Sequence, residues 1–289
     1  MEHQTSLIII EYNRRKHLLN ALNGIENSKK KPDEVVIVSY SDQLQISADT
    51  YTFPIRIRHL SMPEKGGLPA AKARNTGAKL ANYEHLIFLD VDCIPSADFI
   101  GTISKQLQSR ENGIIMGTPK YLSEPVPENF DYNYLERESV FHPRRPRVVQ
   151  IRQEETYELF WSLCFAITKS LLRVLSYFDE HYSGYGGEDT DLAFKARARN
   201  YPFYLSEAVV YHQQHAFYRP PLPQLENIIN NCNHFYDKWG IWAMDKHLKG
   251  FAHQNLIDWD MNCTEKIKIA KKPNTKEVES CLVVDEAYG

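Results

Sequence analysis

The chain has 289 residues, of which 43% are hydrophobic and 12% aromatic, enough apolar mass for one large core or for two lobes that share one. Its formal net charge is −3, so no overall positive field indicates binding to nucleic acid or to an anionic membrane. No apolar run is long enough to span a bilayer, and Met1 opens onto polar residues unlike those of a signal peptide. The five cysteines are scattered without a CxxC pair, which is typical of reduced thiols and predicts a cytoplasmic protein.

In the first 118 residues, short runs rich in β-branched residues alternate with helical patterns. Buried strands are predicted at 6–10, 35–38, 86–89 and 113–116, and an alternating strand near a sheet edge at 55–59. Helices are predicted after Asn13 and over 69–80 and 97–107. The alternation predicts an α/β fold with a mostly parallel central sheet and helices on both faces. In such sheets, ligands bind at the carboxyl ends of the strands.

Residues 119–158 differ in character, because they combine several prolines with many charges. We predict a long loop or lid here, and we expect it to close over a bound ligand. Arg144, Arg145 or Arg147 would then lie near an anionic group of that ligand, and a solvated basic turn is the alternative.

Regular patterns return after this segment. Strands are predicted at 160–167 and 203–212, with a helix ending near Arg199 between them. An apolar helical stripe then runs over 225–239. From about residue 265 the chain is polar and Lys-rich, which predicts a loosely held tail.

Two carboxylates follow directly on the strand predicted at 86–89. Asp90 and Asp92 flank Val91, so hard oxygen ligands are aimed at the strand tip, and Mg²⁺ or Mn²⁺ prefers such ligands. A cation there would neutralise the charge of a diphosphate leaving group. For an isolated D-x-D pair, a turn or a helix cap is the commoner role.

A glycine-rich stretch delivers a second pair of acids. Gly184, Gly186 and Gly187 precede Glu188 and Asp189, which open the next predicted helix. Glycine permits positive φ and close backbone approach, and a helix N-terminus stabilises carboxylates as anions, which suits a catalytic base. The alternative is that the two acids only cap the helix.

Two histidines follow the strand predicted at 203–212. His212 ends that strand and His215 lies three residues on, and an imidazole can complete a metal shell that carboxylates begin. His212 is the first choice as ligand and His215 the second, although a lone histidine is more often a hydrogen-bonded core or surface residue. Upstream, Gly66 and Gly67 open a helix that carries Arg74, and this arrangement suits a phosphate-bearing ligand.

In this order along the chain, the motifs resemble the GT-A glycosyltransferases of family 2. The chain is most similar to a bacterial subgroup related to the galactosyltransferase C-terminal domain. The resemblance covers roughly residues 6 to 260, and the D-x-D and G-G-E-D stretches are its specific parts. It rests on residues 6–14, 67–75, 88–95, 184–191 and 211–213.

The resemblance implies a nucleotide-sugar donor, usually a UDP-sugar, and Mn²⁺ or Mg²⁺. It implies that Asp92, with Asp90, binds the metal and the diphosphate, and that His212 can be a further ligand. It also implies that Asp189 deprotonates the acceptor hydroxyl while Glu188 holds acceptor or sugar hydroxyls. Such enzymes invert the anomeric centre in one in-line displacement, so one base suffices.

From these motifs we assign the site. Donor contacts are predicted from Glu11, Tyr12, Asn13, Arg14, Asp42, Arg74, Asp90, Val91 and Asp92. Acceptor contacts are predicted from Trp161, Tyr185, Gly186, Gly187 and Glu188. Residues 1–118 would form the nucleotide-sugar-binding half, residues 119–264 the acceptor-binding and catalytic half of the same domain, and residues 265–289 the tail. The sugar would be a hexose or N-acetylhexosamine, with galactose favoured. It would be transferred to a hydroxyl acceptor such as a glycan. Peripheral association with a membrane is compatible with this activity.

Two departures concern the nucleotide. Glu11 stands where the family usually has Thr, and the second strand leads into Ser39-Tyr40-Ser41-Asp42 instead of Asp-Asp-Gly-Ser. Either Asp42 substitutes for the usual acid or the base is held differently, and Tyr12 or Tyr40 is a candidate to stack on the base. The alternatives from other classes are a non-catalytic nucleotide-sugar-binding relative and a nucleotidyltransferase, and the absence of glycine after the first strand disfavours the latter.

Overall fold

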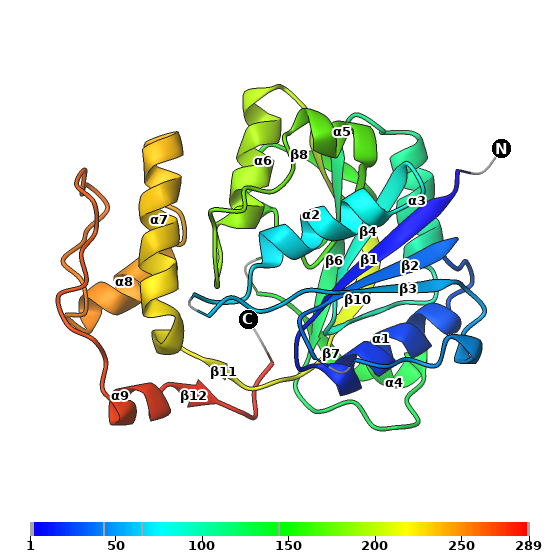
Figure 1. Cartoon of the computed structure of the whole chain (residues 1–289), viewed down its shortest axis with the longest axis horizontal. Helices are drawn as coiled ribbons and strands as arrows, with labels where there is room; N and C mark the ends of the chain where they lie inside the picture. The colour runs from blue at the N-terminus through cyan, green and yellow to red at the C-terminus, as the bar shows by residue number, and fades with distance from the viewer. Residues whose placement is uncertain (1–2, 43, 65, 144, 288–289) are drawn as a thin grey trace.

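We describe residues 3–42, 44–64, 66–143 and 145–287 of a computed structural model. Their main sheet has the strand order β3-β2-β1-β4-β9-β6-β10-β5, with β7 added to β6 and β8 to β10 (Figure 1). The first five strands are β1 (Thr5–Glu11), β2 (Glu34–Ser39), β3 (Ile55–His59), β4 (His85–Asp90) and β5 (Cys93–Pro95). The others are β6 (Ile114–Leu122), β7 (Ser139–Phe141), β8 (Arg152–Glu154), β9 (Cys164–Thr168) and β10 (Phe203–His212).

The sheet is mostly parallel, as predicted. β1 pairs in parallel with β2 and β4, β2 with β3, and β6 with β10. β9 is inserted antiparallel between β4 and β6, and β5 runs antiparallel to β10. β3 is an edge strand, as its alternating pattern indicates.

Helices cover both faces of the sheet. α1 (Arg15–Glu26) and α3 (Phe99–Gln108) pack on one face, and α2 (Ala70–Leu80), α5 (Lys169–Val174) and α6 (Glu188–Ala198) on the other. Both faces of β1 are apolar because each is covered. Leu7 and Ile9 pack in the core beneath α1 and α3, and Ile8 packs in the core beneath α2, α5 and α6. Each such fully buried side chain stabilises the fold by about 1.5–3 kcal/mol, and a strand buried on both faces reads as a continuous apolar run.

A smaller third cluster stands beside the sheet. α7 (Leu225–Trp239) and α8 (Asp245–His253) form it together with the chain that follows, to the left of the sheet in Figure 1. The apolar stripe predicted over 225–239 is the buried face of α7. Short 3₁₀ turns are η1 (Ala48–Thr50), η2 (Tyr157–Leu159) and η3 (Leu222–Gln224).

The segment 119–158 is not one long loop. It contains the end of β6, α4 (Tyr132–Glu138), β7 and β8. α4 forms because the Asp131 side chain accepts a hydrogen bond from the Tyr134 backbone N–H at 2.7 Å and so caps the helix. β7 and β8 form because they add to β6 and β10. Closure of this segment over a ligand stays a prediction, and Arg144 lies outside the described residues.

The segment after residue 265 is also held, contrary to the expectation of a loose tail. Ile269 forms a β-bridge with Ile257, α9 (Thr275–Glu279) begins with a capping box, and β12 (Leu282–Val283) pairs with β11 (Phe217–Tyr218). Gln214 donates to the Val284 carbonyl at the same place. The polar composition of this segment gave no indication of these contacts, which are backbone pairings and a few apolar contacts.

Within the described residues, no helix combines the length and apolar character that crossing a bilayer requires. All five cysteines carry free thiols, in line with the scattered spacing in the sequence.

Candidate active site

Several predicted residues meet at one edge of the sheet because parallel strands end there. Glu11 ends β1, Asp90 ends β4 and His212 ends β10. The antiparallel pairing of β5 with β10 places His212 opposite Cys93, directly after Asp92. The carboxyl edge of the sheet therefore carries the candidate site, as the fold class predicts.

Asp92, His212 and His215 form one group. The Asp92 carboxylate lies 3.5 Å from His212 Nε2 and 3.4 Å from His215 Nε2, and one ligand atom from each residue falls within 4.8 Å of the others. Burial raises the pKa of Asp92, but the two histidines outweigh this and hold the pKa well below its usual range. Burial also lowers the pKa of His212. An anionic carboxylate beside a neutral imidazole is the donor chemistry that a divalent cation needs.

The loop that carries these histidines is fixed to α1. Asn20 Nδ2 donates to Gln213 Oε1 at 2.7 Å, and Gln213 Nε2 donates to the His17 carbonyl at 3.0 Å. The His17 ring nitrogen lies 3.3 Å from the Gln214 carbonyl. These contacts hold the loop against α1, and none of them involves an imidazole nitrogen of His212 or His215.

Asp90 is oriented differently from Asp92. It does not belong to the three-residue group above; its Oδ1 lies 3.2 Å from Arg74 Nη2. Arg74 Nη1 donates to Glu188 Oε1 at 2.9 Å, and the Arg74 side chain is buried. Arg74 is thus paired with two carboxylates, the buried Glu188 and the partly exposed Asp90, and its contact with donor phosphates stays a prediction. Burial still raises the pKa of Asp90, to about 6.

The G-G-E-D stretch places its two acids at the first turn of α6. Gly186 and Gly187 have φ of 79° and 96°, and glycine adopts this left-handed region without strain. Gly187 is the N-cap, so the acids follow the cap instead of serving as it. Burial raises the pKa of Asp189 to about 7, and the neighbouring charge of Glu188 adds to the effect. A carboxyl group with this pKa is suited to exchange a proton near neutral pH.

The glycine stretch is clamped by a residue that the sequence did not single out. Asn231 on α7 donates from Nδ2 to the carbonyls of Ser183, Tyr185 and Gly186, at 3.0, 3.2 and 2.8 Å. The Ser183 N–H returns a bond to Asn231 Oδ1. A polar residue inside the apolar stripe of α7 was the signal available in the sequence.

A pocket of about 490 Å³ opens beside the end of β1. It is lined by Glu11, Asn13, Arg15, Ser41, Asp42 and Leu44. Glu11 is buried and accepts hydrogen bonds from Ser39 Oγ at 2.5 Å and Ser41 Oγ at 3.0 Å. Glu11 therefore fixes the position of Ser39 and Ser41 in the pocket wall. Asp42 also lines the pocket and is exposed to solvent.

The two tyrosines predicted as candidates to stack on a base differ in their exposure to solvent. Tyr12 is 38% exposed, whereas Tyr40 is buried in a small core cluster and donates to the Pro69 carbonyl. Arg14 donates its backbone N–H to Glu11, and its charge helps to lower the pKa of Asp92. Val91 is half-buried against the core.

On the acceptor side, Trp161 is covered. The Arg145 guanidinium lies 3.5 Å from the centroid of the Trp161 ring, and His142 meets the same ring edge-on at 5.0 Å. Burial lowers the pKa of the half-buried Arg145 to about 10. Tyr185 is half-buried and packs edge-on against His247 at 5.6 Å.

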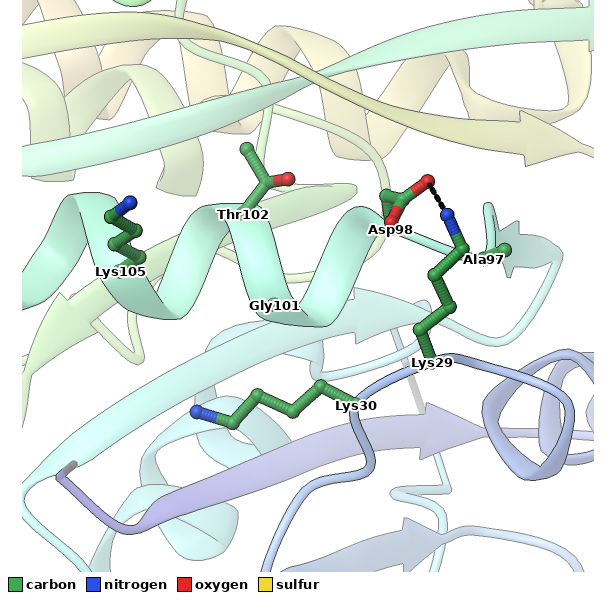
Figure 2. A pocket seen from close by; sticks show the side chains of 7 residues that line it. All are labelled: Lys29, Lys30, Ala97, Asp98, Gly101, Thr102 and Lys105. Atoms are coloured by element: carbon green, nitrogen blue, oxygen red, sulfur yellow. Dashed lines mark hydrogen bonds and ion pairs between the residues drawn. The ribbon is translucent and has the colours of Figure 1, made fainter.

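A second hollow, of about 260 Å³, lies away from these residues. Lys29, Lys30, Asp98 and Lys105 are among its lining residues, and Lys29 Nζ pairs with Asp98 at 2.8 Å (Figure 2). It lies between the end of α1 and the first turns of α3 and contains no predicted site residue. It is a shallow feature between exposed lysines and does not belong to the site.

Comparisons with known proteins agree with this geometry. The model of the family "Glycosyl transferase family 2" matches residues 6–175. Hyaluronan synthase of Pasteurella multocida is 25% identical over 244 residues, which is 74% of this chain and 25% of that protein. The chain thus spans a quarter of this curated relative.

Two solved structures share the fold. TarS 1-349 of S. aureus in complex with UDP-GlcNAc matches with a TM-score of 0.54 and 16% identity, over 73% of this chain and 59% of TarS 1-349. GalNAc-T7 with UDP, GalNAc and Mn²⁺ matches with a TM-score of 0.56 and 14% identity, over 73% of this chain and 43% of that one. The matched family model covers more than half of the chain. The chain belongs to glycosyl transferase family 2 and has a GT-A fold.

Proposed function

We propose that this enzyme transfers a sugar from a UDP-sugar to a hydroxyl group of a glycan acceptor, with inversion, and with a divalent cation bound at Asp92. The observation that carries the proposal is the meeting of two acid motifs across Arg74. Asp90, two residues before Asp92, pairs with one end of the guanidinium, and Glu188, beside Asp189, pairs with the other. The proposed metal site at Asp92 and the candidate base Asp189 thus lie next to residues that pair with opposite ends of the Arg74 guanidinium.

The donor set fits Mn²⁺ or Mg²⁺ when the diphosphate supplies further oxygens. Asp92, His212 and His215 would hold the ion, since one ligand atom from each lies within 4.8 Å of the others. When bound, the ion would neutralise the charge that develops on the leaving diphosphate. The Mn²⁺ named with GalNAc-T7 supports this assignment. Asp90 would act beside the ion, through its pair with Arg74.

Asp189 is the proposed base. It sits in the first turn of α6, and burial raises its pKa to about 7, so the carboxylate can accept the proton of an acceptor hydroxyl as the sugar is transferred. Glu188 is bound to Arg74, which keeps it in place beside Asp189 to receive a sugar or acceptor hydroxyl on its remaining oxygen. A single base is sufficient for one in-line displacement with inversion.

The pocket at Glu11, Asn13 and Asp42 is the proposed nucleotide site. Tyr12, an exposed residue between Glu11 and Asn13 in the chain, is the candidate to stack on the base. UDP in the two matched structures supports uridine as the nucleoside. We propose a hexose or N-acetylhexosamine as the sugar, with galactose favoured by the subgroup resemblance. The name hyaluronan synthase supports a polysaccharide as the acceptor. A cytoplasmic location, with or without peripheral contact to a membrane, stays a prediction.

The test is a calorimetric titration of the protein with UDP, with and without Mn²⁺, beside the Asp92→Ala variant. Binding that needs Mn²⁺ and is lost in the variant supports the donor site, and a screen of UDP-sugars for UDP release then names the sugar. Absence of UDP binding by folded protein would overturn the uridine assignment. If GDP and other nucleotides also fail to bind, the non-catalytic alternative replaces the proposal.

A further inference from the structure

A second group of metal-ligating side chains lies outside the site described above. It consists of Asp179 and His181, in the segment between α5 and α6, and His234 on α7. One potential ligand atom from each residue falls within 4.8 Å of the other two. None of the three belongs to the site described above.

The carboxylate of Asp179 is the centre of the group. Its Oδ1 lies 2.8 Å from His181 Nδ1, and its Oδ2 lies 3.0 Å from His234 Nε2. The His181 and His234 rings are 5.5 Å apart, and Tyr182 meets His234 edge-on at 4.8 Å and so limits the orientation of that ring. Two imidazole nitrogens thus face one carboxylate from two separate segments of the chain.

The spacing of these atoms can be compared with that around a tetrahedral ion. Ligand atoms about 2.0–2.1 Å from Zn²⁺ lie roughly 3.3 Å apart in a tetrahedron. The two distances from imidazole nitrogen to Asp179 oxygen, 2.8 and 3.0 Å, are a few tenths of an ångström shorter than this, and one ligand atom from each residue lies within 4.8 Å of the others. Two imidazoles and one carboxylate suit Zn²⁺, Co²⁺ or Ni²⁺ better than Mg²⁺, which prefers oxygen. The His181 side chain is 82% exposed, so an ion and its water ligand have an entry path.

Lys238 is also bound to Asp179, and it has a second carboxylate partner in Asp191. Its Nζ lies 2.8 Å from Asp179 Oδ2 and 2.5 Å from Asp191 Oδ1. Asp191 is fully buried; it also forms an ion pair with Lys195 at 3.1 Å and accepts a hydrogen bond from Trp239. An ion on Asp179 therefore leaves Lys238 paired with Asp191, and no buried charge loses its last partner.

We propose that Asp179, His181 and His234 form a transition-metal site, with Zn²⁺ as the best fit, that is separate from the donor site. The site joins the segment leading into Glu188 and Asp189 to α7, on which Asn231 already clamps the glycine stretch. Its role is to fasten that segment. The proposal does not depend on the activity proposed above.

The experiment is a titration of the folded protein with Zn²⁺ by calorimetry and with Co²⁺ by visible absorption. The starting protein carries Asp92→Asn and His3→Ala, which disable the other two groups of this kind found among the described residues. His181→Ala is then added, since this exposed side chain is not part of the core. His234→Gln is a second variant, because glutamine keeps a donor for Asp179. His253→Ala, at another exposed histidine, is the matched control.

We expect one equivalent of Zn²⁺ to bind to the starting protein and to raise its melting temperature. We also expect a four-coordinate Co²⁺ spectrum, and an affinity at least about tenfold weaker with His181→Ala or His234→Gln and unchanged with His253→Ala. Mg²⁺ should not compete. The proposal is overturned if the starting protein binds no Zn²⁺, or if it binds Zn²⁺ equally well after both substitutions.

Discussion

Arg74 Nη1 lies 2.9 Å from Glu188 Oε1, although the two residues are 114 positions apart in the sequence. The same guanidinium reaches Asp90 at the end of β4, so one buried cation joins the strand that leads to Asp92 with the helix that carries Asp189. Phe178 packs against the guanidinium, which lies 5.4 Å from the centroid of its ring. The relative position of the two acid motifs therefore depends on Arg74.

Arg74→Met should destabilise the protein strongly. The substitution leaves the buried carboxylate of Glu188 without its cation, and breaking a buried pair in this way costs about 3–5 kcal/mol. It also removes the partner of Asp90, whose side chain is partly exposed. Urea unfolding measures the loss. Arg173→Met, at an exposed position on α5, should change the free energy of unfolding by less than about 0.5 kcal/mol. Equal effects of the two substitutions would show that Arg74 does not hold the site together.

Asp189→Asn should abolish transfer while donor binding persists. An amide cannot accept the acceptor proton, so kcat should fall about 10²–10⁴-fold. UDP affinity in the presence of Mn²⁺ should stay within about twofold of the wild-type value, because Asp92, His212 and His215 are untouched. A variant that transfers sugar at the wild-type rate would remove Asp189 from the role of base.

The stability of the protein should depend on pH through Asp189. Burial raises the pKa of this carboxyl from 3.8 to about 7 in the folded state. A carboxyl with a raised folded-state pKa costs stability as the pH rises between these two values, and the cost is complete above pH 7. Asp189→Asn removes the cost, so it should raise the melting temperature at pH 8 and have little effect at pH 4.

Thermal unfolding of both proteins at pH 4, 6 and 8 measures this difference. Asp258→Asn, at an exposed position, should give no such trend. A gain that is the same at all three pH values would rule out titration of Asp189 as the cause.

His215→Ala should weaken the binding of Mn²⁺ in the presence of UDP by at least about tenfold. Its Nε2 lies 3.4 Å from Asp92, so the variant removes one of the three proposed ligands. Calorimetry with Mn²⁺ on the UDP-saturated protein gives the affinity, and His253→Ala is the control. If only His212→Ala weakens Mn²⁺ binding, His215 is not a ligand.

Asn231→Ala should lower kcat more than it lowers donor affinity. The variant frees three carbonyls of the glycine stretch that precedes Glu188, and a misplaced base slows proton transfer without touching the nucleotide pocket. Asn233→Ala is a matched control on the same helix, since its side chain makes an equivalent two-sided clamp on Ile267. Both variants should lose similar stability, and only Asn231→Ala should lose kcat.

The sequence predicted the parts of the fold that have a local cause. β1, β2 and β4 are continuous apolar runs because both faces of the sheet are covered, and β3 alternates because it lies at an edge. The insertion of β9 between β4 and β6 has no local signature, since strand order depends on long-range pairing. For the same reason the sequence predicts an irregular loop where the structure has α4, β7 and β8.

The candidate site divides in the same way. The D-x-D and G-G-E-D motifs and the two histidines could be placed from sequence, because strand ends and a helix start fix them. The inward turn of Arg74 and the clamp by Asn231 could not, because each depends on partners more than 40 residues away. The sequence also left His212 and His215 as alternatives, whereas the structure places both beside Asp92.

The pairing of β11 with β12 bears on how the protein is made. β11 begins two residues after His215, and its partner strand is supplied by residues 282–283, near the far end of the chain. During synthesis the sheet and the Asp92 loop can fold as their residues leave the ribosome. The segment after His215 must wait until β12 has been translated. The strand that follows the proposed cation-binding loop is therefore paired only after residues 282–283 have been made.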